Sequence, residues 1–461
     1  MKKLNGEDKI INSVKRVHMI GIGGSGMCPL AEILHSKGYI LTGSDNNESD
    51  PLKRVKALGI TVHMGHNPQN VHGAELVVYS AAISKDNPEI VEAEKLGIPL
   101  MERSHLLGAM TRRFDKVIGV CGTHGKTSTS SMITQILYMA NYDPSAVIGG
   151  KLPLINANGR AGNSEYMVCE SCEFVDTFLQ LSPDMSVLLN IDNDHLDYFK
   201  TMDNLVSSFR KFVDMSSIAV VNGDDVLVKK AVDTFTGKII TFGIEESNDF
   251  YAKNIEMGKF GMKFDCFKNR KLLGNIELAI PGKHNVFNAL AAIAACDYYC
   301  VAFEDIKNAI EKFSGAGRRF EKLAEFNGIV LADDYAHHPT EITATLNAIK
   351  ELNFNNVIVV FQPFTFSRTE MLKKEFVEAL SIADKVILTP VMGSREVNTT
   401  GINSEQLAKG IENCYLAGDF NEAADLALKL ANSGDIIITM GGGDIYKVAH
   451  IIMVIVSRNS N

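Results

Sequence analysis

The stretch Val117–Met132, which reads VIGVCGTHGKTSTSSM, restricts the possible folds more than any other part of the chain. Its first residues, Val117–Val120, form the short apolar run that is typical of a buried strand. The segment Gly122-Thr-His-Gly-Lys-Thr127 leaves no room for regular structure, and apolar residues from Met132 onward recur at helical spacing. The sequence therefore predicts a strand, a glycine loop and a helix, which is the arrangement of a phosphate-binding site.

The residue types of this loop suit phosphate groups. Glycines allow backbone N–H groups to approach phosphate oxygens, Lys126 can reach the terminal phosphates, and the Thr127 hydroxyl can ligate Mg²⁺. The spacing departs from the common phosphate loop, because Val120 stands where its first glycine is expected. A glycine turn without a ligand is the alternative. The residues expected at the nucleotide are Gly122, Thr123, His124, Gly125, Lys126, Thr127 and Ser128.

Length and charge limit the possible functions. A chain of 461 residues is expected to contain about two to four domains. The net charge of −9, without any segment in which basic residues gather, gives no support to nucleic-acid binding. The first ten residues contain no apolar h-region, so we expect no signal peptide, and no apolar run approaches the ~18–20 residues of a membrane span. Eight scattered cysteines favour reduced thiols, so we expect a cytoplasmic protein without a membrane partner.

A second glycine motif, near the start of the chain, predicts a β-α-β unit. Gly21-Ile-Gly23-Gly-Ser-Gly26 follows the expected strand Val17–Ile20, and an acid, Asp45, stands about 20 residues further on. This spacing is typical of nucleotide binding, with NAD(P) and another nucleotide diphosphate as alternatives. Ser80 directly follows another expected strand. The candidate ligand contacts of this domain are Gly21, Gly23, Gly24, Ser25, Gly26, Asp45 and Ser80.

Polar residues also follow two strands in the middle of the chain. Glu170 ends the expected strand Tyr166–Cys169, and His195 comes shortly after the strand Met185–Leu189. Carboxylate and imidazole groups at strand ends are candidates for a Mg²⁺ site, although imidazole is an uncommon ligand of this ion. Glu173 is a second candidate acid, for which a charge at the start of a helix is the simpler interpretation.

The segments around these strands are less regular. The segments Ile148-Gly-Gly-Lys151 and Asn156–Asn163 predict a loop, whereas residues 236–280 predict a β-rich insertion. A helix is expected after Pro281, and Asn288 on it either contacts a base or belongs to a polar face.

The last part of the chain predicts a further α/β domain. Ser314-Gly-Ala-Gly-Arg-Arg319 is the best linker candidate, and its two arginines either clamp a phosphate or lie on the surface. Four expected strands follow, and each delivers polar residues at the carboxyl end, where doubly wound sheets bind ligands. These strands are Ile329–Ala332, Val357–Phe361, Val386–Leu388 and Ile436–Met440.

Taken together and in this order, the motifs resemble those of the Mur ligase family over nearly the whole chain. They include HMIGIGGSGM, YSAAI, GTHGKTSTSS, NIDNDHLD, GKHNVFNALAA, GAGRRFE, DDYAHHPTEI, FQPFTFSRT and MGGGDIY. The resemblance implies three α/β domains: a Rossmann-like UDP-sugar-binding domain (1–111), a P-loop ATPase-like domain (112–315) and a Rossmann-like amino-acid-binding domain (316–461).

The resemblance also implies an activity, that of the subfamily that adds the first amino acid in peptidoglycan precursor synthesis. Such a ligase uses ATP and Mg²⁺ to phosphorylate the lactyl carboxylate of UDP-N-acetylmuramate (UDP-MurNAc), and the amine of L-alanine then attacks the acyl phosphate. The implied partners are these two small molecules, and the implied state is a monomer or weak homodimer. A ligase that attaches a preformed peptide is a close alternative, and an NAD(P)-dependent oxidoreductase is a distant one.

The resemblance assigns roles to residues. By similarity Thr127, Glu170 and His195 organise Mg²⁺, and the implied catalytic residues are Lys126, His195 and Arg368. The other implied contacts are Arg319 with phosphates, Asn288 with adenine, and Arg368 with His337 or His338 at the alanine carboxylate.

Two departures from the family pattern stand out. Relatives with this activity often read FQPHRYTRT where this chain has Phe364 and Thr365, so a second arginine near the alanine carboxylate is missing. This leaves the strictness for alanine open. Some Mur ligases carry a carbamylated lysine about 15 residues after the metal histidine, where this chain has Arg210, and we expect no carbamate here.

Overall fold

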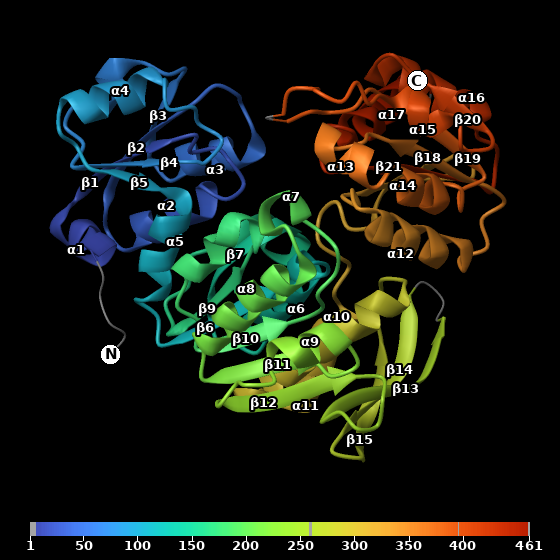
Figure 1. Cartoon of the computed structure of the whole chain (residues 1–461), viewed down its shortest axis with the longest axis horizontal. Coiled ribbons are helices and arrows are strands. Elements are labelled where there is room, and N and C mark those ends of the chain that lie inside the picture. The colour runs from blue at the N-terminus through green and yellow to red at the C-terminus, as the bar shows by residue number, and fades with distance from the viewer. Residues whose placement is uncertain (1–5, 258–260, 395, 460–461) are drawn as a thin grey trace. The chain divides into compact units, whose positions relative to one another are not determined.

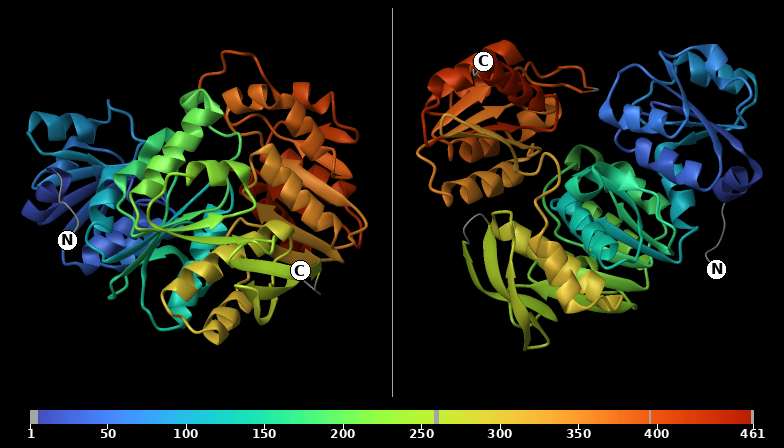
Figure 2. Two further views of the ribbon diagram at one scale, coloured as in Figure 1. Left: turned by 60° about the horizontal axis from the view of Figure 1, so that its bottom comes forward. Right: turned by 180° about the vertical axis from the view of Figure 1, so that it is seen from behind.

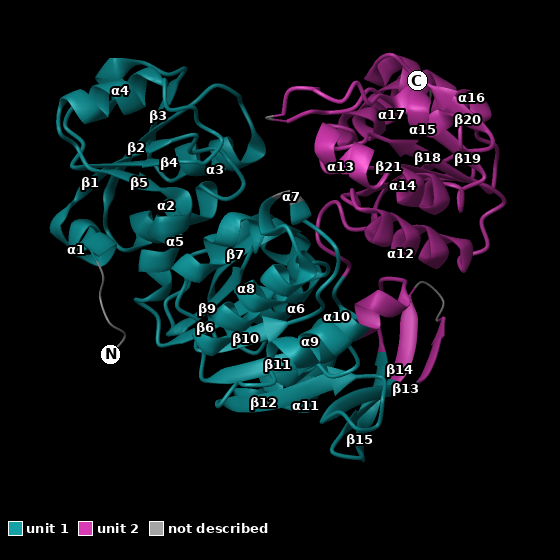
Figure 3. Ribbon diagram, in the orientation of Figure 1, with its two compact units in different colours: residues 1–253, 265–276, 287–313 teal, residues 254–264, 277–286, 314–461 magenta. Residues whose placement is uncertain are grey.

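The computed structural model describes residues 6–257, 261–394 and 396–459 of the chain (Figure 1). These residues form three sheets with helices packed on them, as the sequence predicts. The chain divides into two compact units (Figure 3). Unit 1 comprises residues 1–253, 265–276 and 287–313, and unit 2 comprises residues 254–264, 277–286 and 314–461.

The first sheet of unit 1 has five parallel strands in the order β3-β2-β1-β4-β5. They are β1 (Arg16–Ile20), β2 (Ile40–Asp45), β3 (Thr61–Met64), β4 (Leu76–Tyr79) and β5 (Leu100–Glu102). The helices of this part are α1 (Gly6–Ser13), α2 (Cys28–Ser36), α3 (Asp50–Ala57), η1 (Pro68–Val71), α4 (Pro88–Lys95) and α5 (Arg103–Thr111). The register pairs Ile20 with Ser44 and with Tyr79, so three strand ends meet at the glycine turn.

The second sheet has ten strands in the order β15-β14-β13-β12-β11-β10-β6-β9-β7-β8. The strands are β6 (Lys116–Cys121), β7 (Ser145–Leu152), β8 (Ala157–Arg160), β9 (Tyr166–Glu170), β10 (Met185–Leu188), β11 (Ile218–Asn222), β12 (Lys238–Gly243), β13 (Phe250–Met257), β14 (Met262–Lys268) and β15 (Lys271–Glu277). The helices are α6 (Lys126–Met139), η2 (Pro153–Ile155), η3 (Phe174–Gln180), α7 (Leu196–Phe199), α8 (Met202–Asp214), α9 (Val226–Ala231), α10 (Lys283–Tyr298) and α11 (Phe303–Glu311). The predicted β-rich insertion is confirmed by β12 to β15.

The loop expected at residues 148–151 and 156–163 is wrong for most of these residues. Residues 148–151 and 157–160 belong to an antiparallel hairpin of β7 and β8 at the edge of the sheet, where β7 also pairs in parallel with β9. Glycine and asparagine have low strand propensity, which hides the hairpin in the sequence. Its pairing with β9 supplies the order that the local sequence lacks.

The sheet of unit 2 has six strands in the order β16-β17-β21-β18-β19-β20. They are β16 (Glu321–Phe326), β17 (Ile329–Asp334), β18 (Val357–Phe361), β19 (Lys385–Leu388), β20 (Cys414–Leu416) and β21 (Ile436–Met440). The helices are α12 (Pro339–Lys350), α13 (Phe366–Met371), α14 (Lys373–Leu380), α15 (Ser404–Ala408), α16 (Phe420–Leu430) and α17 (Tyr446–Asn459). All four strands predicted here are confirmed.

Helices cover both faces of this six-stranded sheet, and Figure 2 shows the layers from two further directions. One apolar cluster contains Ile342 of α12 and Val359 of β18, and a second contains Ile358 of β18 and Ile452 of α17. Neighbouring residues of β18 therefore point to opposite faces, and both faces are buried. A parallel strand that is buried on both sides reads as a continuous apolar run, which explains why the sequence identified it.

The described residues contain no helix with the length and apolar character that membrane crossing requires. All eight cysteines are free thiols, in agreement with the sequence prediction.

A buried ionisable cluster lies behind the glycine turn of the first sheet. Glu89 of α4 has a fully buried side chain and accepts hydrogen bonds from Ser44 Oγ and Asn70 Nδ2, both at 2.6 Å. Its carboxylate also lies 3.1 Å from His66 Nδ1 and 3.6 Å from His18 Nε2. Burial raises the pKa of Glu89, but the interactions with His18, Ser44 and Asn70 outweigh burial and lower that pKa to about 2.

We expect acid to weaken this part of the fold. Because the folded pKa of Glu89 lies below the ordinary 4.5, its contribution to stability is complete above about pH 4.5 and is lost as the pH falls toward about 2. The contribution is on the order of 3 kcal/mol. Glu89→Gln should lower the melting temperature near neutral pH and flatten its decline in acid, as measured by thermal denaturation across pH.

The exposed Glu94, on the same helix, provides the control. Glu94→Gln should retain the melting temperature and the acid profile of the unmodified protein. Equal effects of the two substitutions would show that the buried cluster contributes nothing specific.

Candidate functional site

The glycine loop of unit 1 joins the carboxyl end of β6 to α6, as predicted. Gly122 and Gly125 have φ angles of +134° and +84°, which residues with a Cβ rarely adopt. A Cβ at Gly122 would lie 3.1 Å from the backbone nitrogen of Asn190, and a Cβ at Gly125 would overlap the side-chain oxygen of Asn288. The path of the loop therefore requires both glycines, and Asn288 packs directly against it.

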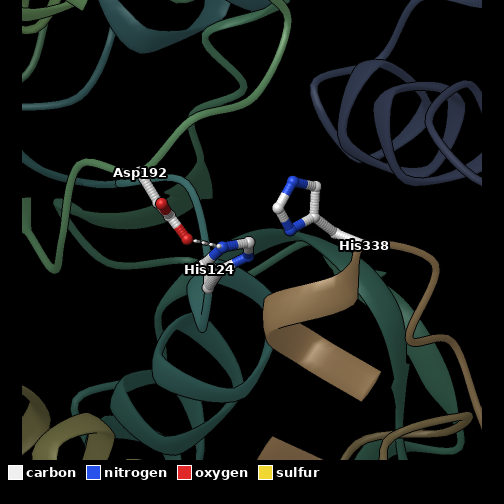
Figure 4. Close-up of side chains that lie close together, drawn as sticks. All are labelled: His124, Asp192 and His338. Atoms are coloured by element: carbon white, nitrogen blue, oxygen red, sulfur yellow. Dashed lines mark hydrogen bonds and ion pairs between the residues drawn. The ribbon is translucent and has the colours of Figure 1, made fainter. Parts of the chain in front are cut away.

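The loop is held by residues at the carboxyl end of β10, which sequence reasoning did not single out. Asn190 accepts the His124 N–H at 2.8 Å through Oδ1 and donates to His124 O at 3.0 Å through Nδ2. The Asp192 N–H donates to Thr123 Oγ1 at 2.9 Å, and the Asp192 carboxylate lies 3.0 Å from His124 Nε2 (Figure 4). His338, which Figure 4 also draws, belongs to unit 2. Both residues belong to the motif NIDNDHLD, which could have identified them as candidate site residues from the sequence.

The ammonium of Lys126 lies inside the loop. It donates to Gly122 O at 2.6 Å and to Thr123 O at 3.0 Å, and it pairs with the Glu173 carboxylate at 2.9 Å. Burial lowers the pKa of Lys126, but attraction to nearby acidic groups, chiefly Glu173, outweighs burial and raises that pKa above its ordinary value. Lys126 therefore stays charged. Glu173 does precede the helix η3, but its buried side chain makes no cap there and faces Lys126 instead.

Two of the three predicted metal ligands lie together. Thr127 Oγ1 donates to Glu170 Oε1 at 3.1 Å, and Glu170 Oε2 accepts the Gly149 N–H of β7 at 2.7 Å. Hydroxyl and carboxylate oxygens are the ligands that Mg²⁺ prefers, so this pair fits the ion. The third predicted ligand, His195, precedes α7 with a φ of +56°, and its ring centre lies 4.7 Å from that of Phe174.

Gly149→Ala tests the position of Glu170 without changing that side chain. A Cβ at Gly149 would lie 2.5 and 2.6 Å from the two carboxylate oxygens, so the Glu170 carboxylate must leave its present position, where it accepts the Thr127 hydroxyl. The φ of Gly149 is not in the left-handed region, so alanine adds no backbone strain. We expect the Mg²⁺ concentration needed for half-maximal activity to rise about tenfold, measured by titrating the ion.

Gly6→Ala is the matched control, because a Cβ at Gly6 would meet nothing within 4 Å. It should leave the Mg²⁺ requirement unchanged, and both variants should keep their melting temperatures. An unchanged Mg²⁺ requirement in Gly149→Ala would remove Glu170 from the metal site.

The second glycine motif forms a turn between β1 and α2. Gly21 has a φ of +76°, and its N–H donates to Ser44 O at 2.8 Å. The Gly23 N–H donates to Asp45 Oδ2 at 2.9 Å. The Cβ of Ser80 lies 3.9 Å from where a Cβ at Gly21 would stand. The structure thus brings the predicted residues Asp45 and Ser80 to this turn.

Arg103 and Asn158 lie at the same turn and were not predicted. The Gly24 N–H donates to Gly21 O at 3.0 Å within the turn. Nη1 of Arg103, the first residue of α5, lies 3.1 Å from where a Cβ at Gly26 would stand. Asn158 Nδ2, from β8, donates to Ser25 O. A guanidinium beside a glycine turn is the kind of cation that binds a diphosphate. The position of Arg103 directly after β5, at the carboxyl end of a parallel strand, could have identified it as a candidate from the sequence.

In unit 2, Arg318 is held by the ends of two strands. Its guanidinium donates to Asp333 Oδ2 at 2.8 Å, and to Gly441 O at 2.7 Å. It also donates to Gly443 O at 3.1 Å and lies 4.9 Å from the ring centre of Tyr335. Arg318 therefore fastens the linker to β17 and to the loop after β21.

The predicted residues Arg319, His337 and His338 lie close to Arg318 in the sequence but have different surroundings. Arg319 lies 3.7 Å from Glu341 and 5.2 Å from the ring centre of Tyr335. His337 Nδ1 lies 3.1 Å from Glu341 Oε2, so Glu341 joins the two predicted residues. His338 accepts a backbone N–H and caps the start of α12.

The two positions that depart from the family pattern lie at the same edge of this sheet. The ring centres of Phe364 and His337 are 6.1 Å apart, and a Cβ at Gly442 would lie 3.4 Å or less from both side chains. Thr365 has a φ of +66°, a strained backbone for a β-branched residue. The predicted Arg368 lies on the short helix α13, which begins at Phe366, directly after Phe364 and Thr365.

Three family models match the chain. They are the Mur ligase family, catalytic domain, at residues 16–115, the Mur ligase middle domain at residues 120–296, and the Mur ligase, glutamate ligase domain, at residues 318–443. The UDP-N-acetylmuramate--L-alanine ligase of Caldicellulosiruptor bescii is 45% identical over 448 residues, which cover 95% of this chain and 98% of that protein. The ligase of the same name from Acetivibrio thermocellus is 41% identical over 451 residues, 96% of each chain.

Solved structures agree with these similarities. The crystal structure of UDP-N-acetylmuramate-alanine ligase MurC from Thermotoga maritima matches with a TM-score of 0.83 and 28% identity, covering 97% of this chain and 100% of that chain. The UDP-N-acetylmuramate:L-alanyl-gamma-D-glutamyl-meso-diaminopimelate ligase from Neisseria meningitides matches with a TM-score of 0.60 and 27% identity, covering 66% of this chain and 100% of that chain.

Proposed function

The chain belongs to the Mur ligase family, and we propose that it joins L-alanine to the lactyl carboxylate of UDP-MurNAc in an ATP-dependent reaction of peptidoglycan precursor synthesis. The observation that carries the proposal is the similarity to ligases of that name, 45% and 41% identical over nearly the full length of both chains.

The three sheets correspond to three proposed functional domains, at residues 1–111, 112–315 and 316–461. Support comes from the contents of each sheet: a glycine turn with Arg103 in the first, the phosphate loop in the second, and the polar edge around Glu341 in the third. In this proposal they bind UDP-MurNAc, ATP and L-alanine, in that order.

The middle domain would carry the phosphoryl transfer. A carboxylate is a poor electrophile, and its phosphorylation by ATP supplies phosphate as a leaving group. Lys126 neutralises the negative charge of the transferred phosphoryl group, and the N-terminus of α6 adds partial positive charge. Thr127 and Glu170, with His195, would hold Mg²⁺, which supplies a further positive charge beside the phosphate oxygens.

The second step forms the amide. The amine of L-alanine attacks the carbonyl carbon of the acyl phosphate, a C–N bond forms, the C–O bond to phosphate breaks, and the amine loses a proton. The cationic side chain of Arg368, with His337 or His338, would hold the alanine carboxylate, and Asn288 and Arg319 would contact ATP. The proposed UDP-MurNAc contacts are Gly21, Gly23, Gly24, Ser25, Gly26, Asp45, Ser80 and Arg103.

A peptide-attaching ligase is the second candidate function. It is favoured by the similarity to the Neisseria ligase, whose name specifies a tripeptide, although that match covers only 66% of this chain. The oxidoreductase alternative loses its support, because the segment that carries the N-terminal glycine motif, Gly21–Gly26, matches a Mur ligase domain.

We further propose that the protein acts in the cytoplasm, where the nucleotide substrates are made, as a monomer or weak homodimer. Analytical ultracentrifugation of the unmodified protein measures its oligomeric state.

Phosphate release from ATP tests the reaction. With Mg²⁺ and UDP-MurNAc present, we expect release to be fastest with L-alanine, slower with glycine or L-serine, and slow with L-alanyl-γ-D-glutamyl-meso-diaminopimelate. Release only with the tripeptide would favour the second candidate. Release that does not require UDP-MurNAc would contradict both.

Lys126→Ala separates the two substrate sites. Loss of the buried ammonium should reduce turnover about a hundredfold or more, whereas UDP-MurNAc binding, measured by calorimetry, should remain. Lys116→Ala removes a partly exposed lysine of the same sheet, outside the loop, and serves as the control. Loss of UDP-MurNAc binding in Lys126→Ala would contradict the division of the two sites between domains.

A further inference from the structure

Glu173 lies where the proposed function expects a phosphate group. The ammonium of Lys126 has three protons to donate. Its backbone acceptors in the loop are Gly122 O at 2.6 Å and Thr123 O at 3.0 Å. The remaining contacts are with Glu173, at 2.9 Å from Oε2 and 3.1 Å from Oε1. The Glu173 carboxylate thus accepts the third N–H of Lys126, which a terminal phosphate of the nucleotide would otherwise accept.

The charge of Glu173 depends on Lys126. The Glu173 side chain is 2% exposed and that of Lys126 is 14% exposed, so the two charges are largely removed from water. Among the described residues of unit 1, the Glu173 carboxylate accepts its hydrogen bonds from Lys126. A buried carboxylate that loses its counter-ion is strongly destabilised. Anything that draws Lys126 away therefore carries an electrostatic penalty.

The backbone fixes Glu173 in this position. The turn that follows it contains Val175 and Asp176 with φ angles of +54° and +56°, and Asp176 N–H donates to Glu173 O at 2.9 Å. A left-handed conformation is strained for a β-branched residue such as Val175. The Asp176 side chain accepts hydrogen bonds from Tyr198 Oη at 2.9 Å and from Ser208 Oγ. The backbone that carries the Glu173 side chain is therefore held in place beside Lys126.

We propose that Glu173 is a positioning residue that holds Lys126 in the nucleotide-free protein and makes nucleotide binding depend on Mg²⁺. The inference rests on the proposed function. When Lys126 turns its third proton to a phosphate oxygen, the buried Glu173 is left facing the negative charge of the phosphates. A divalent cation at Thr127 and Glu170 offsets that repulsion, since Glu170 is within electrostatic reach of Lys126. A nucleotide without its metal therefore binds more weakly.

Glu173→Gln removes the charge and retains the shape. We expect ADP without Mg²⁺ to bind the variant about tenfold more tightly than the unmodified protein, whereas ADP with Mg²⁺ should change less. Titration calorimetry in EDTA and in Mg²⁺ measures both affinities. Without nucleotide, the variant should have a lower melting temperature, because Lys126 loses its counter-ion.

Glu165→Gln is the matched control. It makes the same change in a lysine ion pair of the same sheet, Lys116–Glu165 at 2.6 Å, but at an exposed site. It should leave both affinities and the melting temperature unchanged. Glu173→Asp retains the charge and should retain the Mg²⁺ dependence, which keeps the test open if the glutamine variant folds poorly.

The outcomes separate this inference from the proposed function. If Glu173→Gln binds metal-free ADP no more tightly than the unmodified protein, or if Glu173→Asp loses the Mg²⁺ dependence, the role of Glu173 is overturned and the proposed function stands. If the unmodified protein binds no ADP even with Mg²⁺, the proposed function fails, and this inference fails with it.

Discussion

The buried ammonium of Lys126 is the charge on which the arrangement of the middle sheet depends. A buried cation is stable only with close acceptors, and the protein supplies two loop carbonyls and Glu173. Strand β6 delivers the loop, β9 leads to Glu170 and Glu173, and β10 leads to Asn190, which holds the loop. These three strands are neighbours in the order β10-β6-β9, so segments far apart in the sequence meet at one edge.

Most of the fold and part of the site could be predicted from the sequence, because their signals are local. A parallel strand buried on both faces gives an apolar run, and a glycine loop follows it directly. The hairpin at Gly149 was missed because its order comes from pairing with β9. The contact of the Glu173 side chain with Lys126 was missed for a similar reason. It depends on a left-handed backbone at Val175 and Asp176, and neither residue type predicts that conformation.

Adjacent residues in unit 2 show the same limit. Arg318 and Arg319 are chemically identical and follow each other in the linker, and the family resemblance selected Arg319 as a phosphate contact. In the structure Arg318 binds Asp333 and two backbone carbonyls, whereas Arg319 lies beside Glu341. A φ of +59° at Arg318 helps to turn the two side chains to different neighbours. Only three-dimensional contacts separate the structural arginine from the candidate ligand.

If Lys126 binds phosphate as proposed, the Glu173 carboxylate beside it repels the same ligand, and we propose that this repulsion has a physical use. Without Glu173, the buried Lys126 would have only carbonyl dipoles to balance its charge, and the loop would be less stable when empty. With Glu173, the empty loop is stable, and two negative groups then compete for one cation when the nucleotide arrives. The competition is relieved by a second cation near Glu170. A single buried charge can thus stabilise the free protein and select the metal-bound form of its substrate.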